Sequence, residues 1–147
     1  MTDRLTPCDF CDLPEVQDRV FLETDLVKAL PTHMPVVPGH VLIIPKRHVS
    51  GEADLTADER EAISRTVRTL RGALADLFGA EGYNFAWNEG IGQSVPHLHL
   101  HMLPRKEGDT GITKYEPRQF LYRPGSREKT PESEARAVAA LIRDRLG

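Results

Sequence analysis

The hydrophobic positions of this chain follow two periods, and the change from one to the other divides it into strands and helices. Segments that are short and apolar, or that alternate apolar and polar residues, are typical of strands. Segments with an apolar residue at every third or fourth position are typical of helices that bury one face. By these criteria the chain contains five predicted strands, at Arg19–Glu23, Leu26–Leu30, Gly39–Pro45, Tyr83–Asn88 and Val95–Leu103.

Two helices are predicted from the same pattern. The first begins after Thr56, because Thr56 and Glu59 have the spacing of a capping box, and it ends at Gly79. Its apolar positions are Ile63, Val67, Leu70, Leu74, Leu77 and Phe78. The second begins at Thr130-Pro131, since proline favours the first turn of a helix. Its predicted apolar face consists of Ala135, Val138, Leu141, Ile142 and Leu146.

The order of these elements predicts an α+β fold with an antiparallel five-stranded sheet, one long helix and a C-terminal helix. A strictly alternating strand–helix arrangement fits poorly, because neither the first pair of strands nor the last has a helix between its members. The 147 residues have the length of one domain. We therefore expect residues 1–147 to form a single domain, with a tail that begins at about residue 109 and leads into the C-terminal helix.

Charge and composition exclude several classes of protein. The net charge is −3, and the chain has no basic stripe of the kind that follows a nucleic-acid backbone, so we expect no nucleic-acid partner. No segment has the length of a membrane span and the N-terminus lacks an apolar signal core, which predicts a cytoplasmic protein with no membrane partner. Both cysteines lie in Cys8-Asp9-Phe10-Cys11, where they form either a metal half-site or a redox pair.

The densest chemistry lies in the last predicted strand. Three of the six histidines, His97, His99 and His101, alternate with Leu98 and Leu100. In an extended strand alternate side chains share a face, so the three imidazoles line one face and the leucines enter the core. Such a row can bind a metal, bind an anion or act as a nucleophile. A polar strand face with incidental histidines accounts poorly for so dense a cluster.

Two segments of the chain resemble the histidine triad family of nucleotide hydrolases and transferases. Gly92–Arg105 contains the histidine row, and Pro38–His48 precedes the long helix. Asn88-Glu89-Gly90 fits a shorter part of the same pattern. The resemblance runs from about Cys8 to Arg105. It implies the α+β fold of that family and an attack on the α-phosphate of a nucleotide.

The resemblance implies a role for each residue of the pattern. His99 is the expected nucleophile, through a nucleotidyl-histidine intermediate, and His101 and His40 are expected to line its pocket. The expected phosphate contacts are Asn88, Gln93, Ser94 and His101. A neutral imidazole, whose ordinary pKa is about 6.5, is a competent nucleophile if a partner holds the proton on its other nitrogen. A backbone carbonyl can serve as that partner.

A second site is implied by the zinc-binding members of the family and by the related galactose-1-phosphate uridylyltransferases. Those proteins hold zinc with a Cys-x-x-Cys pair, a histidine after the Pro-Lys block and the first histidine of the triad. The matching residues are Cys8, Cys11, His48 and His97. Two thiolates and two imidazoles make a closed tetrahedral set, which is typical of structural zinc. Free thiols near a disordered N-terminus are the alternative.

The resemblance leaves several functions open. It favours a hydrolase or nucleotidyltransferase of the diadenosine polyphosphate type, with an adenine-containing nucleotide as substrate and a homodimer as the assembly. A nucleoside phosphoramidase of the same family is the alternative, and Thr32 stands near where many relatives carry an Asn or Asp that holds the ribose. From the residues alone, a metal-dependent enzyme with His97, His99 and His101 as catalytic ligands, or an inactive nucleotide-binding module, also remains open.

Overall fold

The structure is a computed structural model in which residues 8–90, 97–109 and 131–147 are described. Its helices and strands follow one another as α1 (Asp9–Asp12), α2 (Pro14–Arg19), β1 (Leu22–Glu23), β2 (Val27–Pro31), β3 (Val41–Pro45), the 3-10 turn η1 (Glu52–Asp54), α3 (Ala57–Phe78), β4 (Gly82–Trp87), β5 (Leu100–Arg105) and α6 (Glu132–Leu146).

The described strands form one five-stranded sheet in the order β1-β2-β3-β5-β4, in which every neighbouring pair is antiparallel. The predicted α+β fold with a five-stranded antiparallel sheet is therefore confirmed. β3 and β5 lie side by side at the centre, and their register sets Leu42 opposite His101. Because partners in register share a face of the sheet, His101 and Leu42 lie on the same side.

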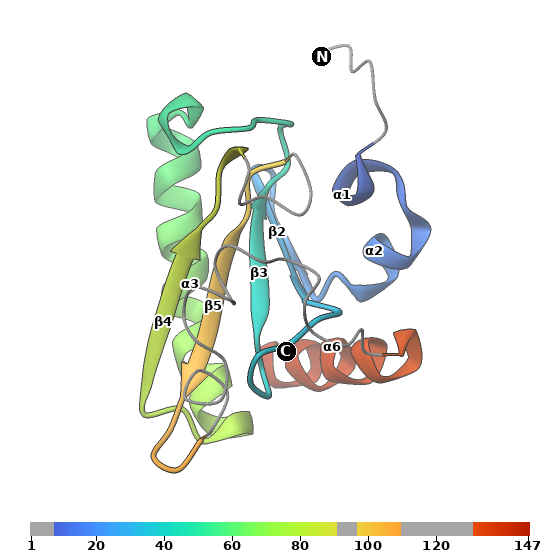
Figure 1. Cartoon of the computed structure of the whole chain (residues 1–147), viewed down its shortest axis with the longest axis vertical. Helices are drawn as coiled ribbons and strands as arrows, with labels where there is room; N and C mark the ends of the chain where they lie inside the picture. The colour runs from blue at the N-terminus through green and yellow to red at the C-terminus, as the bar shows by residue number, and fades with distance from the viewer. Residues whose placement is uncertain (1–7, 91–96, 110–130) are drawn as a thin grey trace.

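The two faces of the sheet are covered by different helices (Figure 1). One face packs against α3 and α6, and its strands contribute apolar side chains that include Ala29, Ile43 and Met102. The other face, which carries Leu42 and Ile44, packs against the α1–α2 segment. Strand alternation therefore places the even-numbered residues of β3, together with His101, on the side of α1.

The long helix confirms the prediction at both ends. Thr56 and Glu59 form the capping box, and Gly79 adopts a left-handed conformation with φ of 70° immediately after α3. Its apolar stripe, including Ile63, Leu70 and Leu74, packs against its own sheet. Neither α3 nor any other helix of the described ranges combines the length and apolarity that a membrane crossing requires.

The first predicted strand is wrong over most of its length. Arg19 is the last residue of α2, and β1 begins only at Leu22. The two short helices before it make contacts outside their own turns, such as the bond from Gln17 Nε2 to the Phe10 carbonyl (3.0 Å) and the bond from Lys28 Nζ of β2 to the same carbonyl (2.6 Å). Pro14 at the first position and Glu15 in the first turn of α2 are the local signals that favour a helix there.

The histidine strand is shorter than predicted. β5 begins at Leu100, so His97 and His99 lie just before it, and residues 95 and 96 fall outside the described part of the chain. The alternation nevertheless continues through this segment, because Leu98, Leu100 and Met102 all belong to the core beneath α3. The prediction of which face each side chain takes is confirmed.

The C-terminal helix is confirmed with a different buried face. Its N-cap residue is Pro131, which makes no side-chain capping bond, and its buried residues are Ala135, Ala139 and Ile142. Leu141, predicted to be buried, is 51% exposed.

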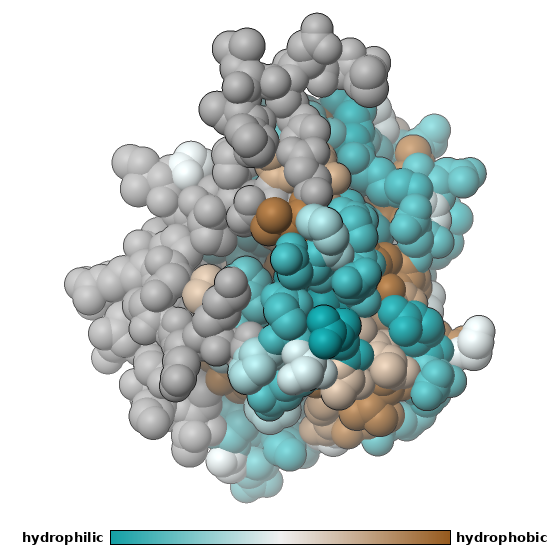
Figure 2. All heavy atoms as spheres, turned by 90° about the vertical axis from the view of Figure 1, so that its right-hand side faces the viewer, coloured by the Kyte–Doolittle hydropathy of each residue, from teal (hydrophilic) through white to brown (hydrophobic). Residues whose placement is uncertain are grey.

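Figure 2 shows the side of the molecule that carries α1, α2 and α6, where hydrophobic side chains gather in the lower part of a mainly hydrophilic surface. The tail predicted to begin at about residue 109 lies mostly outside the described residues.

One buried ion pair joins α6 to α2. Arg19 Nη1 donates to both carboxylate oxygens of Glu132, at 2.8 and 3.0 Å. The Arg19 side chain is only 2% exposed, whereas that of Glu132 is 29% exposed. Removing one partner of such a pair leaves a buried charge without compensation, which costs more than the pair itself contributes.

We expect Glu132→Ala to lower the free energy of unfolding by about 2–3 kcal/mol, because it leaves the buried Arg19 guanidinium without its carboxylate partner. Equilibrium urea unfolding measures this. Glu134→Ala is the matched control, since Glu134 is exposed and lies in the same first turn of α6. Equal losses in the two variants would mean that the charge of the first turn, and not the pair with Arg19, stabilises the helix.

Candidate active site and metal centre

Five histidines gather on the face of the sheet that α1 covers. Ring centroids are 4.8 Å apart for His48 and His97, 4.9 Å for His99 and His101, and 5.3 Å for His40 and His101. His40, His97 and His99 are at most 1% exposed, and His101 is 8% exposed. The structure therefore brings together every histidine that the sequence singled out, and what each ring can do depends on which of its nitrogens carries the proton.

The backbone decides this for His99. Its Nδ1 lies 2.8 Å from the carbonyl oxygen of His97. A carbonyl only accepts hydrogen bonds, so Nδ1 carries the proton, and Nε2 of the neutral ring keeps its lone pair. Burial lowers the pKa of His99, although the bond to His97 opposes this. A neutral ring with a free lone pair on Nε2 is the form in which an imidazole attacks phosphorus.

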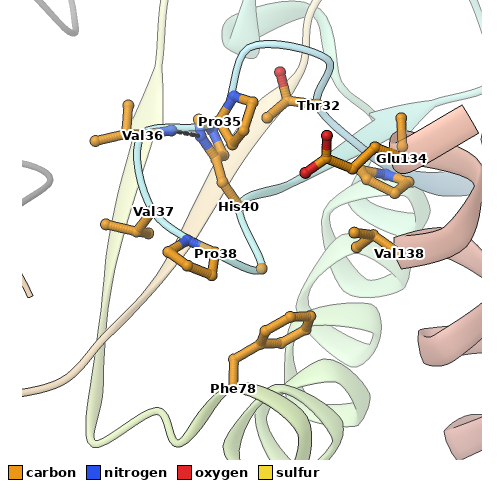
Figure 3. Close-up of a pocket in the computed structure, with 12 residues that line it drawn as sticks. Thr32, Pro35, Val36, Val37, Pro38, His40, Phe78, Glu134 and Val138 are labelled. Carbon is orange, nitrogen blue, oxygen red and sulfur yellow. Dashed lines mark hydrogen bonds between the residues drawn. The ribbon is translucent and has the colours of Figure 1, made fainter. Parts of the chain in front are cut away.

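His40 and His101 are joined by a hydrogen bond, and their ring protons lie on the other nitrogen from that of His99. The amide of Val36 donates to His40 Nδ1 at 3.1 Å, so the neutral His40 ring carries its proton on Nε2 (Figure 3). His40 Nε2 lies 3.0 Å from His101 Nδ1 and donates to it. His101 in its neutral form then carries its own proton on Nε2. Nε2 of His99 therefore carries a lone pair, whereas Nε2 of His101 carries a proton and can donate a hydrogen bond.

The loop before β3 places His40. Gly39 has a φ of 87°, and a Cβ there would lie 2.8 Å from atoms of Phe78 and Pro104, so only glycine fits. The loop also borders a cavity of about 290 Å³ that reaches α6. Thr32 and, from α6, Glu134 are among the residues that line it in Figure 3. The Thr32 hydroxyl accepts from the amide of Met34 at 3.2 Å, and it therefore shapes the loop.

The second cluster consists of Cys8, Cys11, His48 and His97, whose ligand atoms all lie within 4.8 Å of one another. Cys8 Sγ and Cys11 Sγ lie 3.4 and 3.5 Å from His97 Nδ1, and Cys11 Sγ lies 3.7 Å from His48 Nδ1. These four residues could hold a metal ion. Sulfur and nitrogen ligands of a tetrahedral zinc ion lie about 3.6 Å apart, given its usual bond lengths, so the spacing fits.

His97 is held ready for that role by the backbone. Its Nε2 donates to the carbonyl of Pro45 at 2.8 Å, which leaves the lone pair of Nδ1 directed at the two sulfurs. The pKa of His97 is lowered to about 4, chiefly because burial disfavours the charged ring. A metal ligand must be a neutral imidazole, and a bond from its other nitrogen to a carbonyl is the usual way to orient it.

The remaining predicted site residues divide into two groups. Asn88 is buried and directly follows β4. The last pair of the β4–β5 ladder is Trp87 and Leu100. Asn88 comes directly after Trp87, and His99 comes directly before Leu100, so both flank this end of the ladder. Gln93 and Ser94 lie outside the described residues. Their phosphate contacts therefore stay predictions.

Two residues of this region were not predicted from the sequence. The ring of Phe10 packs edge-on against His99, with centroids 4.9 Å apart, and Lys28 is buried beneath α1. Lys28 stands inside the apolar segment Leu26–Leu30, and a lysine in such a segment is the signal that could have indicated it.

Comparison with known proteins agrees with this geometry. The sequence profile of the HIT domain matches residues 14–108, which is well over half of the chain. The chain belongs to the HIT domain family. The resemblance to the histidine triad family seen in the sequence is thereby confirmed, and α6 lies beyond the part of the chain that the HIT profile matches.

Individual HIT relatives support this membership. The chain is 38% identical over 96 residues to a bis(5'-nucleosyl)-tetraphosphatase of Schizosaccharomyces pombe, a match that covers 64% of the chain but 53% of that protein. It is 34% identical to a bis(5'-adenosyl)-triphosphatase of Dictyostelium discoideum, with 80% and 76% covered. The structure resembles a zinc-bound histidine triad family protein of Mycobacterium smegmatis, at 25% identity and a TM-score of 0.69, over 95% of this chain and 92% of that one. The chain therefore spans about half of one of these curated relatives.

Proposed function

We propose that this protein is a nucleotide hydrolase or nucleotidyltransferase of the diadenosine polyphosphate type, with His99 as its nucleophile. The observation that carries this proposal is the bond from His99 Nδ1 to the His97 carbonyl, which leaves the Nε2 lone pair free to attack. The names of the two curated relatives support the substrate class, because both split nucleoside polyphosphates. An adenine-containing nucleotide is the proposed substrate.

The proposed reaction has two steps. His99 Nε2 attacks the α-phosphorus, a nitrogen–phosphorus bond forms, and the bond from phosphorus to the bridging oxygen breaks, so the second nucleotide or phosphate leaves with the electron pair. Water or another acceptor then attacks the phosphorus and gives up a proton to solvent, while the nitrogen–phosphorus bond breaks and its electron pair returns to Nε2 of the neutral ring. Negative charge grows on the phosphoryl oxygens, and the N–H of His101, held by His40, is the proposed donor to them. Asn88, Gln93 and Ser94 are the other proposed phosphate contacts.

The geometry argues against the histidine row as a set of catalytic metal ligands. His97 is directed at the cysteines, His99 bonds a carbonyl through Nδ1, and His101 accepts from His40. In the described part of the chain, the group of potential ligands that converges takes only His97 from the row. The three rings therefore serve three different partners.

His99→Ala is expected to lower turnover of diadenosine tetraphosphate at least about a thousandfold, because the nucleophile itself is removed. The parent protein, incubated with labelled substrate and quenched in base, should carry a base-stable, acid-labile adduct that the variant lacks. Turnover that survives in the variant would reject the mechanism. A panel of diadenosine polyphosphates and adenosine phosphoramidates then distinguishes the hydrolase from the phosphoramidase alternative.

We also propose that the ion held by Cys8, Cys11, His48 and His97 is zinc. Two sulfur and two nitrogen ligands suit zinc better than magnesium or calcium, which prefer oxygen. The zinc-bound relative from Mycobacterium smegmatis supports this choice. With four protein ligands the ion has no open position for water, so its proposed role is structural.

Elemental analysis is expected to find close to one zinc per chain, and Cys8→Ser is expected to lose most of it. The variant should melt several degrees below the parent, because metal binding stabilises only the folded state. A strong chelator should lower the melting temperature of the parent and leave that of the variant almost unchanged. The proposal would be contradicted by a parent protein that contains no metal and whose melting temperature does not change on adding the chelator.

The proposed assembly is a homodimer joined through β4. This strand stands at the end of the strand order, and Phe85 on it is 41% exposed. Beside it lies a groove of about 390 Å³ that Arg71, Phe85 and Trp87 help to line. An exposed aromatic ring on a strand at the edge of the described sheet suits a second copy of the chain. The cytoplasmic location expected from the sequence stays a prediction.

Phe85→Arg is expected to shift the protein from dimer to monomer in sedimentation velocity at micromolar concentration, because it places a charge in the proposed interface. Leu141→Arg is the control, since Leu141 is also exposed, at 51%, but lies on α6. A parent that sediments as a monomer would contradict the proposed dimer.

A further inference from the structure

The strand β2 contains a buried charge that neither the proposed reaction nor the metal ligands use. Lys28 is 8% exposed, and the other residues of β2 are apolar. Its Nζ donates to the carbonyl of Phe10 at 2.6 Å and to Gln17 Oε1 at 3.4 Å. Burying an ammonium group is costly unless strong hydrogen bonds compensate it. Both of these acceptors belong to the α1–α2 segment, so the lysine fastens that segment to the sheet.

The fastened carbonyl lies at the centre of the metal-binding turn. Phe10 stands between Cys8 and Cys11, and the amide of Cys11 donates to the Cys8 carbonyl at 3.1 Å to close the turn. The Phe10 carbonyl also accepts from Gln17 Nε2 at 3.0 Å. Two donors thus hold one carbonyl, and this fixes the direction of the sulfur on either side of it.

The same turn lies against the proposed nucleophile. The ring of Phe10 is 4% exposed and meets the ring of His99 at a centroid distance of 4.9 Å and an angle of 78°. It also meets His97 at 5.9 Å and 69°. A displacement of the Phe10 backbone would therefore change both the positions of the two sulfurs and the packing around His99.

Burial lowers the pKa of Lys28, and the nearby groups Cys11, Glu23 and Cys8 act in the opposite direction. Because burial disfavours the charged form, the ammonium group depends on its two hydrogen bonds to the α1–α2 segment.

We propose that Lys28 is a positioning residue, whose bond to the Phe10 carbonyl sets the cysteine turn both for metal binding and for contact with His99. This inference rests on the metal site and the nucleophile proposed above. It implies that the metal centre and the active site are coupled through a single turn, and that this turn is held in place by a residue of β2.

The test uses the full chain and cobalt(II) as the metal. Metal-free protein is titrated with cobalt in competition with a chelator, and the visible absorption of the bound ion reports affinity and ligand set. Lys28→Met removes the ammonium and keeps the length of the side chain. Lys46→Met is the matched control, since Lys46 is 37% exposed and pairs with Glu23. Gln17→Met removes the second donor to the same carbonyl from an exposed position.

Lys28→Met is expected to bind cobalt about tenfold to a hundredfold more weakly, as is usual when a residue that orients metal ligands is lost. The shape of the spectrum should not change, because the four ligands remain. Its kcat should fall about tenfold with KM within about twofold, because the nucleophile is misplaced while substrate contacts persist. Gln17→Met should change both quantities in the same direction by about threefold, and Lys46→Met should change neither.

Thermal melts separate positioning from a merely structural role. In Lys28→Met the metal-free protein should melt within about 3 °C of the metal-free parent, because an apolar side chain of similar size replaces a costly buried charge. The increase in melting temperature on adding cobalt should shrink. Cobalt affinity equal to that of the parent would overturn the role of Lys28. A parent that binds no cobalt would overturn the metal site itself, and an inactive parent would overturn the proposed function.

Discussion

The chemistry of this site depends on backbone groups that fix the proton on each histidine ring. The carbonyl of His97 holds the Nδ1 proton of His99, and the carbonyl of Pro45 holds the Nε2 proton of His97. The amide of Val36 sets the polarity of His40, which then sets that of His101. Three histidines that look equivalent in the sequence are thereby differentiated: His97 into the proposed metal ligand, His99 into the proposed nucleophile and His101 into a hydrogen-bond donor. Rigid strands and a glycine-dependent loop hold these backbone groups, so the differentiation is a property of the fold.

Sheet register is the second constraint. Leu42 lies opposite His101, and Leu98 and Met102 enter the core beneath α3. A slip of one residue would move the histidines into that core and the leucines to the side of α1, which the hydrophobic pattern forbids. One face of the sheet can therefore carry both the proposed metal centre and the proposed active site. Phe10, which contacts His97 and His99, lies at the boundary between the two.

The parts that the sequence could predict are those set by local pattern. Periodicity predicted α3, and the alternation of His99 with Leu98 predicted their opposite faces; both follow from side-chain direction alone. The short helices α1 and α2 were missed, because they are stabilised by Lys28 and the cysteine turn and not by their own propensity. The buried face of α6 was misplaced at Leu141, since its contacts with α2 and α3 select Ala139 in its place. The proton positions on the rings could not be predicted, because they depend on the direction of backbone groups. The Pro45 carbonyl reaches His97 only in the folded chain, and the His97 carbonyl, although two residues from His99, is aimed at that ring only by the local backbone conformation.

The most direct test of this account is the protonation pattern of the rings themselves. Long-range ¹H–¹⁵N correlation spectra of the zinc-loaded protein near neutral pH distinguish the two nitrogens of each neutral imidazole. His99 is predicted to carry its proton on Nδ1, and His40, His97 and His101 are predicted to carry theirs on Nε2. A spectrum in which His99 is protonated on Nε2 would contradict the account, because its attacking nitrogen would then have no lone pair.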